Sequence, residues 1–459
     1  MQQVLPSAQR DMPPNNIDIE ALLDRNPLSR LQKLVLGLCA VAAFIDGADR
    51  QSIGVIAHSL MQELHLSATQ LGFIFSLDNL GAVVGAIVCG WLSDRFGRKP
   101  IMLASIAVMA IFTGLTAFSY SFHTLAIVRF GAGFGLGGAA PCFITLASEY
   151  VPKRMRSTTA AIIFAAYPLG AACGGFLNSY VIAHYDWPVV FYIGTILPLI
   201  LLAVAAPAMP ESMQFLLSHG APEKRMLKIA RALDRSLVGT ALRFTRPHQD
   251  EPARVRSGST RALFADGLAR QTLCLWGIFF FAYATSKILS FWLPNILTSG
   301  GLPPSSSAIV QGCYNTGNFI GMIAAGRLIE KLGARRALAP ALLVTAAAMA
   351  IVGLYPTNLT ALLIVITVGG CSLGISMAGV VSITAGLYPT SLRATGMGAG
   401  MASSRFGQVV APLGIALLVD MALDTQQIML AVAAVPLCAF LMVLWFARAK
   451  HREAAMPQA

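Results

Sequence analysis

Apolar residues fall into twelve long segments along this chain, and polar stretches separate them. An α-helix needs about 20 predominantly apolar residues to cross a bilayer. Only helices and closed barrels satisfy every backbone polar group in lipid, and uniformly apolar runs of this length are typical of helices. The pattern predicts an all-α membrane protein with twelve transmembrane helices, at approximately 33–57, 69–92, 100–120, 123–149, 157–183, 188–208, 271–294, 305–329, 335–355, 359–387, 394–419 and 425–447.

Lys and Arg are unevenly distributed among the connections between these segments. Neither residue occurs in the connections 58–68, 121–122, 184–187, 295–304, 356–358 and 420–424. The alternate connections contain clusters such as Arg95, Arg98 and Lys99, and residues 209–270 carry eleven Lys and Arg. Connections rich in Lys and Arg stay in the cytoplasm, so we expect both termini and residues 209–270 on the cytoplasmic side.

The long connection divides the segments six and six, and the two groups repeat each other. The stretch 90–99 returns at 326–335 and the stretch 152–158 returns at 389–395, with offsets of 236 and 237 residues. Parallel six-helix repeats with a binding site between them describe one large class of transporters. The sequence therefore predicts an N-terminal tail (1–32), a first half (33–208), a linker (209–270), a second half (271–448) and a C-terminal tail (449–459).

Composition supports a membrane protein and argues against other classes. The chain is 56% hydrophobic and 12% charged, whereas soluble domains contain about 25% charged residues. The net charge of +12 follows from membrane topology, so we expect no nucleic-acid partner. The eight cysteines are dispersed through apolar runs, which favours a packing role over metal ligation. No motif indicates an enzyme or a cofactor.

Three charged residues, Asp46, Asp49 and Arg50, lie inside the first apolar segment. Ionisable residues at membrane depth are costly and mark candidate sites for protons, ions or substrates. Their helical spacing places all three on roughly one face. We expect a proton-binding and anion-handling site here. A structural pair between Asp46 and Arg50 is the simpler alternative, although it leaves one acid unpaired.

Other charged residues lie at similar depth in later segments. Arg129 in the fourth segment is level with Asp46 and Asp78, so we expect a salt bridge to one of these acids. Asp78 is a further candidate for proton coupling or a structural pair. Arg405 lies near the middle of the eleventh segment with no acid close in sequence, which favours bidentate binding of a substrate carboxylate. Lys287 is nearer the outer face, where snorkelling is the alternative to a functional role.

Aromatic residues near these charges offer surfaces for a ring-bearing substrate. Tyr283 and Tyr314 are our candidates, with ordinary packing as the alternative.

The stretch Gly90-x-x-x-Asp94-Arg95-x-Gly97-Arg98-Lys99 resembles the signature of the major facilitator superfamily. Its charged side chains can form ion pairs that hold two halves closed at the cytoplasmic end, or they only set topology. Further candidates for this gate lie at the same end of the helices and are Glu149 (beside Arg156), Arg156 and Glu330.

Four stretches together resemble the aromatic acid:proton symporter family of that superfamily. They are the lead-in 19–32, the acidic motif 46–49, the run 129–141, and the region from Tyr388 to Arg405. The resemblance implies a major facilitator fold, proton coupling by Asp46 and Asp49, and a role for Arg129 and Arg405 in substrate recognition or coupling. It also places Arg393 in the inner gate. Ala48, His58 and Cys142 depart from the family pattern and leave the identity of the substrate open.

The resemblance further implies import of an aromatic carboxylate of the benzoate or hydroxybenzoate type, with a proton, across the bacterial inner membrane. We expect the monomer to be functional. A carrier or exporter of a nonaromatic organic anion and a transporter-like receptor are the alternatives. The linker is short and polar, which disfavours an added signalling domain.

Overall fold

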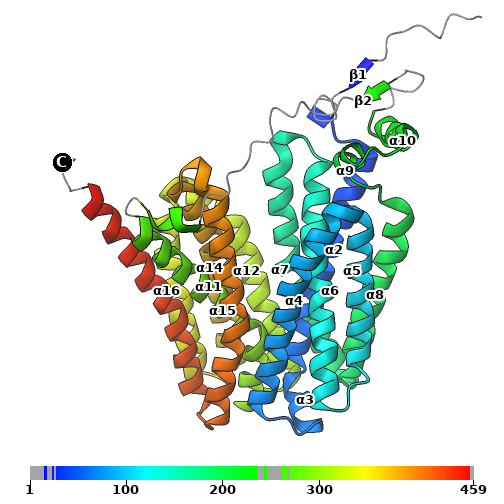
Figure 1. The fold of residues 1–459 in the computed structure, drawn as a ribbon. Helices are drawn as coiled ribbons and strands as arrows, with labels where there is room; N and C mark the ends of the chain where they lie inside the picture. Colours follow the sequence, from blue (N-terminus) through cyan, green and yellow to red (C-terminus); the bar gives the residue numbers. More distant parts are fainter. Residues whose placement is uncertain are drawn as a thin grey trace, which may run out of the picture.

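The computed structural model of this chain describes residues 15–17, 23–24, 27–234, 242–244, 260–265 and 268–454. Within these ranges, twelve helices of 19 to 32 residues form two groups of six (Figure 1). The first group is α2 (Arg30–Val55), α4 (Ala68–Phe96), α5 (Arg98–Thr116), α6 (Phe122–Glu149), α7 (Arg156–His184) and α8 (Pro188–Ala208). The second is α11 (Leu268–Ser299), α12 (Pro304–Leu332), α13 (Ala334–Leu354), α14 (Leu359–Leu387), α15 (Thr390–Asp420) and α16 (Thr425–Ala454). This confirms the predicted fold class.

Helix α12 differs in composition from the other long helices. Eleven helices in the described part of the chain are long and apolar enough to cross a membrane, and α12 is not among them. Its sequence is less apolar partly because it contains Gln311, Asn315 and Asn318. All three of these polar residues are buried. Buried polar residues in a membrane bundle face other helices or a cavity and not lipid. We therefore assign α12 as the twelfth helix, with its polar side turned inward.

The two halves are packed in the same pattern. Helix α4 packs on α6 as α12 packs on α14, and α2 packs on α7 as α11 packs on α15. The contact between α6 and α4 is close because Gly133 has no side chain, and a Cβ there would overlap the backbone oxygen of Asp78. Small residues allow helices in membranes to approach at this distance. The sequence repeat is thus also a repeat of packing.

Short elements accompany the bundle at one end. Helices α9 (Met213–Ser218) and α10 (Glu223–Leu233) follow α8, and the 3₁₀ segments η1 (Lys153–Met155) and η3 (Thr260–Phe264) precede α7 and α11. Strand β1 (Asn15–Ile17) pairs in parallel with β2 (Leu242–Phe244), a three-residue pairing that hydropathy does not indicate. The rest of the predicted tails and linker, residues 1–14, 18–22, 25–26, 235–241, 245–259, 266–267 and 455–459, lies outside the described residues.

The two ends of the bundle differ in charge. We call the end with the α4–α5, α6–α7, α12–α13 and α14–α15 connections the basic end, because these connections carry the Lys and Arg clusters. The opposite end, which includes α3 (Ala57–Glu63), we call the neutral end. In Figure 1 the two halves stand further apart at the basic end, near α9 and α10, than at the neutral end.

Contacts between the halves are concentrated toward the neutral end. The ring of Phe75 in α4 stacks on Phe291 in α11 with centroids 4.8 Å apart, and meets Trp292 edge-on at 5.5 Å. The carboxylate of Asp420, at the end of α15, accepts hydrogen bonds from the backbone N–H groups of Ala68 (3.0 Å) and Thr69 (2.9 Å) at the start of α4. The Thr69 hydroxyl donates to the same carboxylate. These contacts close the neutral end.

Candidate functional site

Helix α2 carries the charged residues of the first segment. Nε of Arg50 donates to Oδ1 of Asp46, one turn earlier, at 3.0 Å, and both side chains are buried. The i,i+4 pair that we considered as the simpler alternative is therefore present. It neutralises Asp46 locally and leaves Asp49 outside the pair.

Asp49 is enclosed within the first half and is only 2% exposed. The Thr113 hydroxyl of α5 donates to Oδ2 of Asp49 at 3.3 Å. Oδ1 has no hydrogen-bond partner among the described residues. No cation lies within 4 Å of this carboxyl group in the part of the chain that the structure describes. Asp49 therefore differs from its neighbours in having no counter-charge in contact.

Asp78 and Arg129 form the most enclosed ion pair of the described bundle. Nη2 of Arg129 donates to Oδ1 of Asp78 at 2.6 Å, and both residues are 0% exposed. The close approach of α4 and α6 at Gly133, one turn after Arg129, brings the two together. The structure thus pairs Arg129 with one of the two acids expected from depth. In this conformation Arg129 contacts Asp78 and does not face open space.

Arg405 is placed differently from the other central arginines. It is exposed, although it lies in the middle of the 31-residue helix α15. Its charge interacts with Asp46 and Arg50 of the opposite half, and with Tyr167 and Tyr283. These interactions place the guanidinium on the surface between the halves and not on the lipid side. Arg405 is thus accessible to a ligand, with Tyr283 beside it.

Lys287 of α11 does not snorkel to the surface. The residue is only 8% exposed, and its Nζ lies 5.2 Å from the centre of the Phe291 ring. Its charge interacts with those of Arg50, Asp78, Arg405 and Asp46. We call these seven side chains (Asp46, Asp49, Arg50, Asp78, Arg129, Lys287 and Arg405) the central charge cluster. Tyr314 is also buried, at 1% exposed, in α12.

An amide network joins the halves at the neutral side of this cluster, and sequence reasoning missed it. Nε2 of Gln311 donates to Oε1 of Gln51 at 2.9 Å, and Nε2 of Gln51 donates to Oδ1 of Asn315 at 3.3 Å. All three side chains are buried. The available signal was the i,i+4 spacing of Gln311 and Asn315 in a segment of reduced hydrophobicity. A search guided by charge passes over such uncharged residues.

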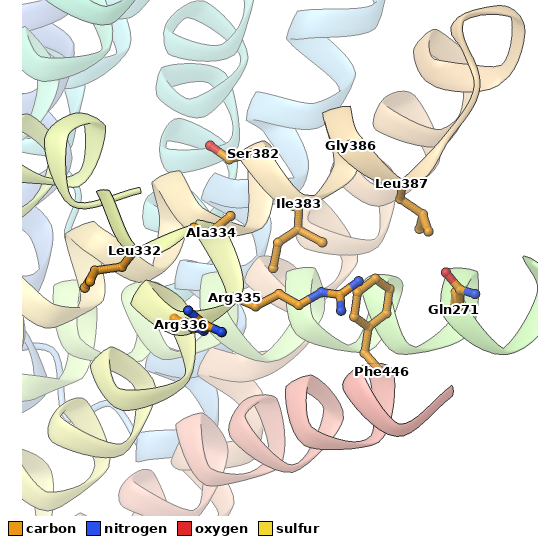
Figure 2. Close-up of a pocket in the computed structure, with 11 residues that line it drawn as sticks. Gln271, Leu332, Ala334, Arg335, Arg336, Ser382, Ile383, Gly386, Leu387 and Phe446 are labelled. Carbon is orange, nitrogen blue, oxygen red and sulfur yellow. The ribbon is translucent and has the colours of Figure 1, made fainter. Parts of the chain in front are cut away.

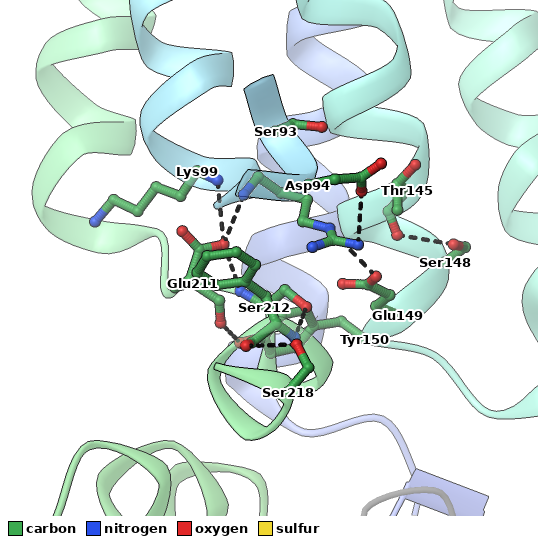
Figure 3. Close-up of polar contacts among 12 residues, drawn as sticks. Ser93, Asp94, Lys99, Thr145, Ser148, Glu149, Tyr150, Glu211, Ser212 and Ser218 are labelled. Atoms are coloured by element: carbon green, nitrogen blue, oxygen red, sulfur yellow. Dashed lines mark hydrogen bonds and ion pairs between the residues drawn. The ribbon is translucent and has the colours of Figure 1, made fainter. Parts of the chain in front are cut away.

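A second polar cluster lies at the basic end of the first half (Figure 3). Nη2 of Arg98 pairs with Asp94 at 3.2 Å, and its Nε lies 3.6 Å from Glu149. One carboxylate oxygen of Glu211 accepts hydrogen bonds from the backbone N–H groups of Arg98 (3.0 Å) and Lys99 (3.2 Å). An anion at the start of α5 is stabilised by the helix dipole. These ion pairs link helices within one half.

The Tyr150 hydroxyl secures the same region by donating to the backbone oxygen of Glu211 at 2.6 Å. Burial, together with the nearby carboxylates of Glu211 and Glu149, raises the pKa of Tyr150, so this hydroxyl remains a donor.

Among the remaining gate candidates, no ion pair within 4 Å joins Arg95, Glu330 or Arg393 to the opposite half in the described part of the chain. The exposed Arg95 lies over the rings of Trp91 and Phe96, at 5.9 and 5.7 Å. The half-buried Arg156 interacts electrostatically with Glu149. Glu330 and Arg393 are exposed, and neither has an ion-pair partner within 4 Å among the described residues.

A pocket opens at the basic end of the second half (Figure 2). Its lining comes from α11, the end of α12, α13, α14, α16 and the turn at Gly333. It includes Arg335, whose guanidinium lies 4.6 Å from the centre of the Phe446 ring. Gly333 is the repeat equivalent of Gly97, and both have positive φ. The pocket contains no member of the central charge cluster.

Within the described ranges, no group of three or more His, Cys, Asp and Glu side chains is arranged to hold a metal ion.

Comparisons with known proteins first define the class. The family model described as Major Facilitator Superfamily matches residues 39–247 and 275–458. The xylose transporter XylE from E. coli in an inward-open conformation superposes with a TM-score of 0.70 at 16% identity, covering 91% of this chain and 96% of that one. The D-xylose-proton symporter gives a TM-score of 0.67 at 15% identity, covering 89% and 96%. The chain is a membrane transporter of the major facilitator superfamily, and not an enzyme.

Curated relatives narrow the assignment. The 4-hydroxybenzoate transporter PcaK of Acinetobacter baylyi is 32% identical over 395 residues, which cover 86% of each chain. The gallate transporter of Pseudomonas putida is 33% identical over 405 residues, covering 86% of this chain and 88% of the relative. The 3-(3-hydroxy-phenyl)propionate transporter of Escherichia coli is 33% identical over 404 residues, covering 85% and 88%. Within the superfamily, this chain belongs to the aromatic acid:proton symporter family.

Proposed function

We propose that this protein imports an aromatic carboxylate of the benzoate or hydroxybenzoate type together with a proton. Relatives at 32 and 33% identity are named as transporters of 4-hydroxybenzoate and gallate. The observation that carries the proposal is the position of Arg405. Its guanidinium is accessible between the halves, beside Tyr283, with no carboxylate within 4 Å among the described residues. A planar guanidinium binds a carboxylate bidentately, and the tyrosine ring offers a stacking surface.

The proton is assigned to Asp49. Asp46 and Asp78 each have an arginine in contact, whereas Asp49 has one hydroxyl donor and one oxygen without a partner. A buried carboxylate without a counter-charge is costly, and protonation removes that cost. Asp49 also interacts electrostatically with Arg129, Asp78 and Asp46. We therefore assign the Asp78–Arg129 pair to the coupling network and not to direct substrate contact.

Transport then proceeds by alternating access, with the two halves rocking around the central charge cluster. We assign the basic end and both termini to the cytoplasm, by the distribution of Lys and Arg, in the bacterial inner membrane. The described conformation is then open to the cytoplasm. In the opposite conformation the first-half residues would approach the second-half residues and close that end. The first-half residues are Asp94, Arg95, Arg98, Glu149 and Arg156, and the second-half residues are Glu330 and Arg393. Because both halves of one chain contribute to the cluster, we propose the monomer as the functional unit.

The test is uptake of labelled 4-hydroxybenzoate into proteoliposomes with and without an inward proton gradient. We expect accumulation above equilibrium that a protonophore abolishes. Asp49→Asn removes the proton site, so it should abolish gradient-driven accumulation while counterflow exchange of substrate persists. Asp186→Asn makes the same chemical change at an exposed position between α7 and α8 and should transport normally.

Four outcomes would contradict the proposal. Uphill uptake by Asp49→Asn at the wild-type rate would remove the proton role of this residue. Binding of 4-hydroxybenzoate without transport would favour a receptor. Selective transport of a nonaromatic acid would favour a carrier of nonaromatic organic anions, and net efflux would favour an exporter.

A further inference from the structure

Lys287 is the one member of the central charge cluster to which neither the fold nor the proposed function gives a role. Most of the side chain is buried. Its Nζ atom is nevertheless not fully enclosed, so the ammonium reaches accessible space. No carboxylate lies within 4 Å of it in the described part of the chain. An ammonium in such a confined position, with three donors and no counter-charge in contact, is costly unless a ligand satisfies it.

The charge balance of the cluster points to an anionic ligand. Four cations (Arg50, Arg129, Lys287 and Arg405) face three carboxyl groups (Asp46, Asp49 and Asp78). Arg50 and Arg129 are each paired with an acid, which leaves Lys287 and Arg405 as the two cations without a partner. If Asp49 carries a proton, the cluster has an excess of two positive charges. One carboxylate neutralises only one of them.

The position of Lys287 along α11 determines the order in which an entering ligand meets the side chains of the site. Phe279, Tyr283, Lys287 and Phe291 follow at intervals of four residues, which places consecutive members one above the other on one side of the helix. Lys287 lies about 18 Å from the neutral end of α11, and Arg405 about 22 Å from that end of α15. The two helices pack against each other. A ligand entering from the basic end meets Arg405 and Tyr283 first, and Lys287 one turn deeper.

Phe291 forms the floor below the ammonium. Its ring lies under Nζ of Lys287 at 5.2 Å and stacks on Phe75 of the opposite half. This aromatic contact belongs to the closed neutral end, so Lys287 lies directly on the basic-end side of that barrier.

We propose that Lys287 is a specificity-determining residue, the second anchor of the substrate site. The inference rests on the proposed function. Arg405 holds the carboxylate, Tyr283 lies along the ring, and the Lys287 ammonium donates a hydrogen bond to a second acidic oxygen further into the protein. That oxygen belongs to a phenolic hydroxyl or to a second carboxylate. The site therefore selects aromatic acids with an acidic oxygen at both ends over plain benzoate.

The experiment measures equilibrium binding of three ligands to the purified full-length protein: benzoate, 4-hydroxybenzoate and benzene-1,4-dicarboxylate. In the wild type, at least one of the two longer ligands should bind about 10- to 100-fold more tightly than benzoate, the range typical of a hydrogen bond to a charged group. The ligand that shows the preference identifies the second oxygen as phenolic or carboxylate.

Lys287→Met should abolish this preference by lowering the affinity for the longer ligand to that for benzoate. The affinity for benzoate itself should change less than about threefold. Lys33→Met, the same change at an exposed position at the start of α2, should keep the wild-type preference. Equal binding of all three ligands by the wild type would overturn the inference and leave the proposed function intact. An equal loss for all three ligands in Lys287→Met would show a structural role instead.

The wild-type comparison stands even if Lys287→Met does not fold, and Lys287→Gln, which keeps a donor without the charge, then replaces it. Absence of binding of every aromatic acid to the wild type would overturn the proposed function as well.

Discussion

The three acids of the central cluster are chemically alike, and their surroundings set them apart. Asp46 and Asp78 contact arginines, while Asp49 has a threonine hydroxyl and an oxygen without a partner. The four cations divide in the same way, since Arg50 and Arg129 are paired and Arg405 and Lys287 are not. Charges paired inside the protein hold its helices together. Unpaired charges that reach open space are available to a ligand.

The first prediction at this scale concerns Arg405. Arg405→Lys keeps the positive charge and loses the planar fork that binds a carboxylate through two parallel hydrogen bonds. We expect affinity for the aromatic acid to fall by about tenfold with expression unchanged, a loss near 1.4 kcal/mol. Binding measurements on purified protein give the affinity. Arg327→Lys, at an exposed position on α12, serves as the control. Unchanged affinity in Arg405→Lys would exclude a direct role in binding.

Sequence reasoning performed unevenly for individual residues. Depth along the helices was enough to predict an acid partner for Arg129, and the structure pairs it with Asp78. Helical spacing was enough to recognise the pair of Asp46 and Arg50. Neither rule indicates which way a side chain such as Lys287 turns, because rotation about the helix axis is set by packing between helices. Lys287 is buried, so the snorkelling alternative is wrong for this residue.

At the scale of elements, glycine in α6 controls the geometry of the Asp78–Arg129 pair. The Asp78–Arg129 pair is short because α4 and α6 approach closely at Gly133. In the second half, Gly370 of α14 occupies a comparable position against the backbone oxygen of Tyr314 in α12. Helix number and order followed from hydropathy, and the repeat followed from the two recurring stretches, 90–99 and 152–158. The amide face of α12 did not, because uncharged polar residues only dilute an apolar segment.

The element-scale prediction is that Gly133→Ala separates α4 from α6. Its Cβ would overlap the backbone oxygen of Asp78, so one helix must move. We expect a loss of about 1–3 kcal/mol in stability, typical of overpacking, together with impaired proton coupling. Thermal unfolding in detergent measures the first effect and gradient-driven uptake the second. Gly90→Ala, where nothing lies within 4 Å of the added Cβ, should be neutral or slightly stabilising. Equal behaviour of the two variants would refute this account.

At the scale of the whole molecule, the halves are joined by polar contacts of modest strength. Asp420 caps α4 across the halves, and the amides of Gln51 and Gln311 meet nearer the middle of the bundle. Each such hydrogen bond contributes about 1 kcal/mol net to stability, so these contacts can form and break readily. The Arg98 ion pairs, by contrast, connect helices of a single half and so can persist while the halves move.

The prediction at this scale concerns Asp420. Asp420→Ala removes the acceptor for two backbone N–H groups at the start of α4, so the conformation that is closed at the neutral end loses stability. We expect a shift of about 1 kcal/mol, roughly a fivefold change in the ratio of closed to open molecules. Distances between spin labels at Gln62 and Gln426, both exposed at this end, would report the shift.

Asp424 provides a matched control, because its carboxylate caps α16 within one half by accepting from the backbone N–H of Gln427 at 2.7 Å. Asp424→Ala should leave the label distances unchanged. A similar change in both variants would mean that loss of any helix cap, and not loss of the link between halves, alters the conformation.

The contacts between the two halves are concentrated toward the neutral end, so the molecule can act as a lever about that end. Helices of 29 residues, such as α4 and α12, are about 44 Å long. In the proposed rocking motion, a pivot at the level of Gln311 lies about 10 Å from the neutral end of α12. It leaves a short arm of about 12 Å to the level of Arg405 and a long arm of about 34 Å to the basic end. A displacement of about 1 Å at the ligand is then magnified to about 3 Å at the tips. Contraction around a small anion is therefore enough to swing the far ends of the helices by the width of a side chain.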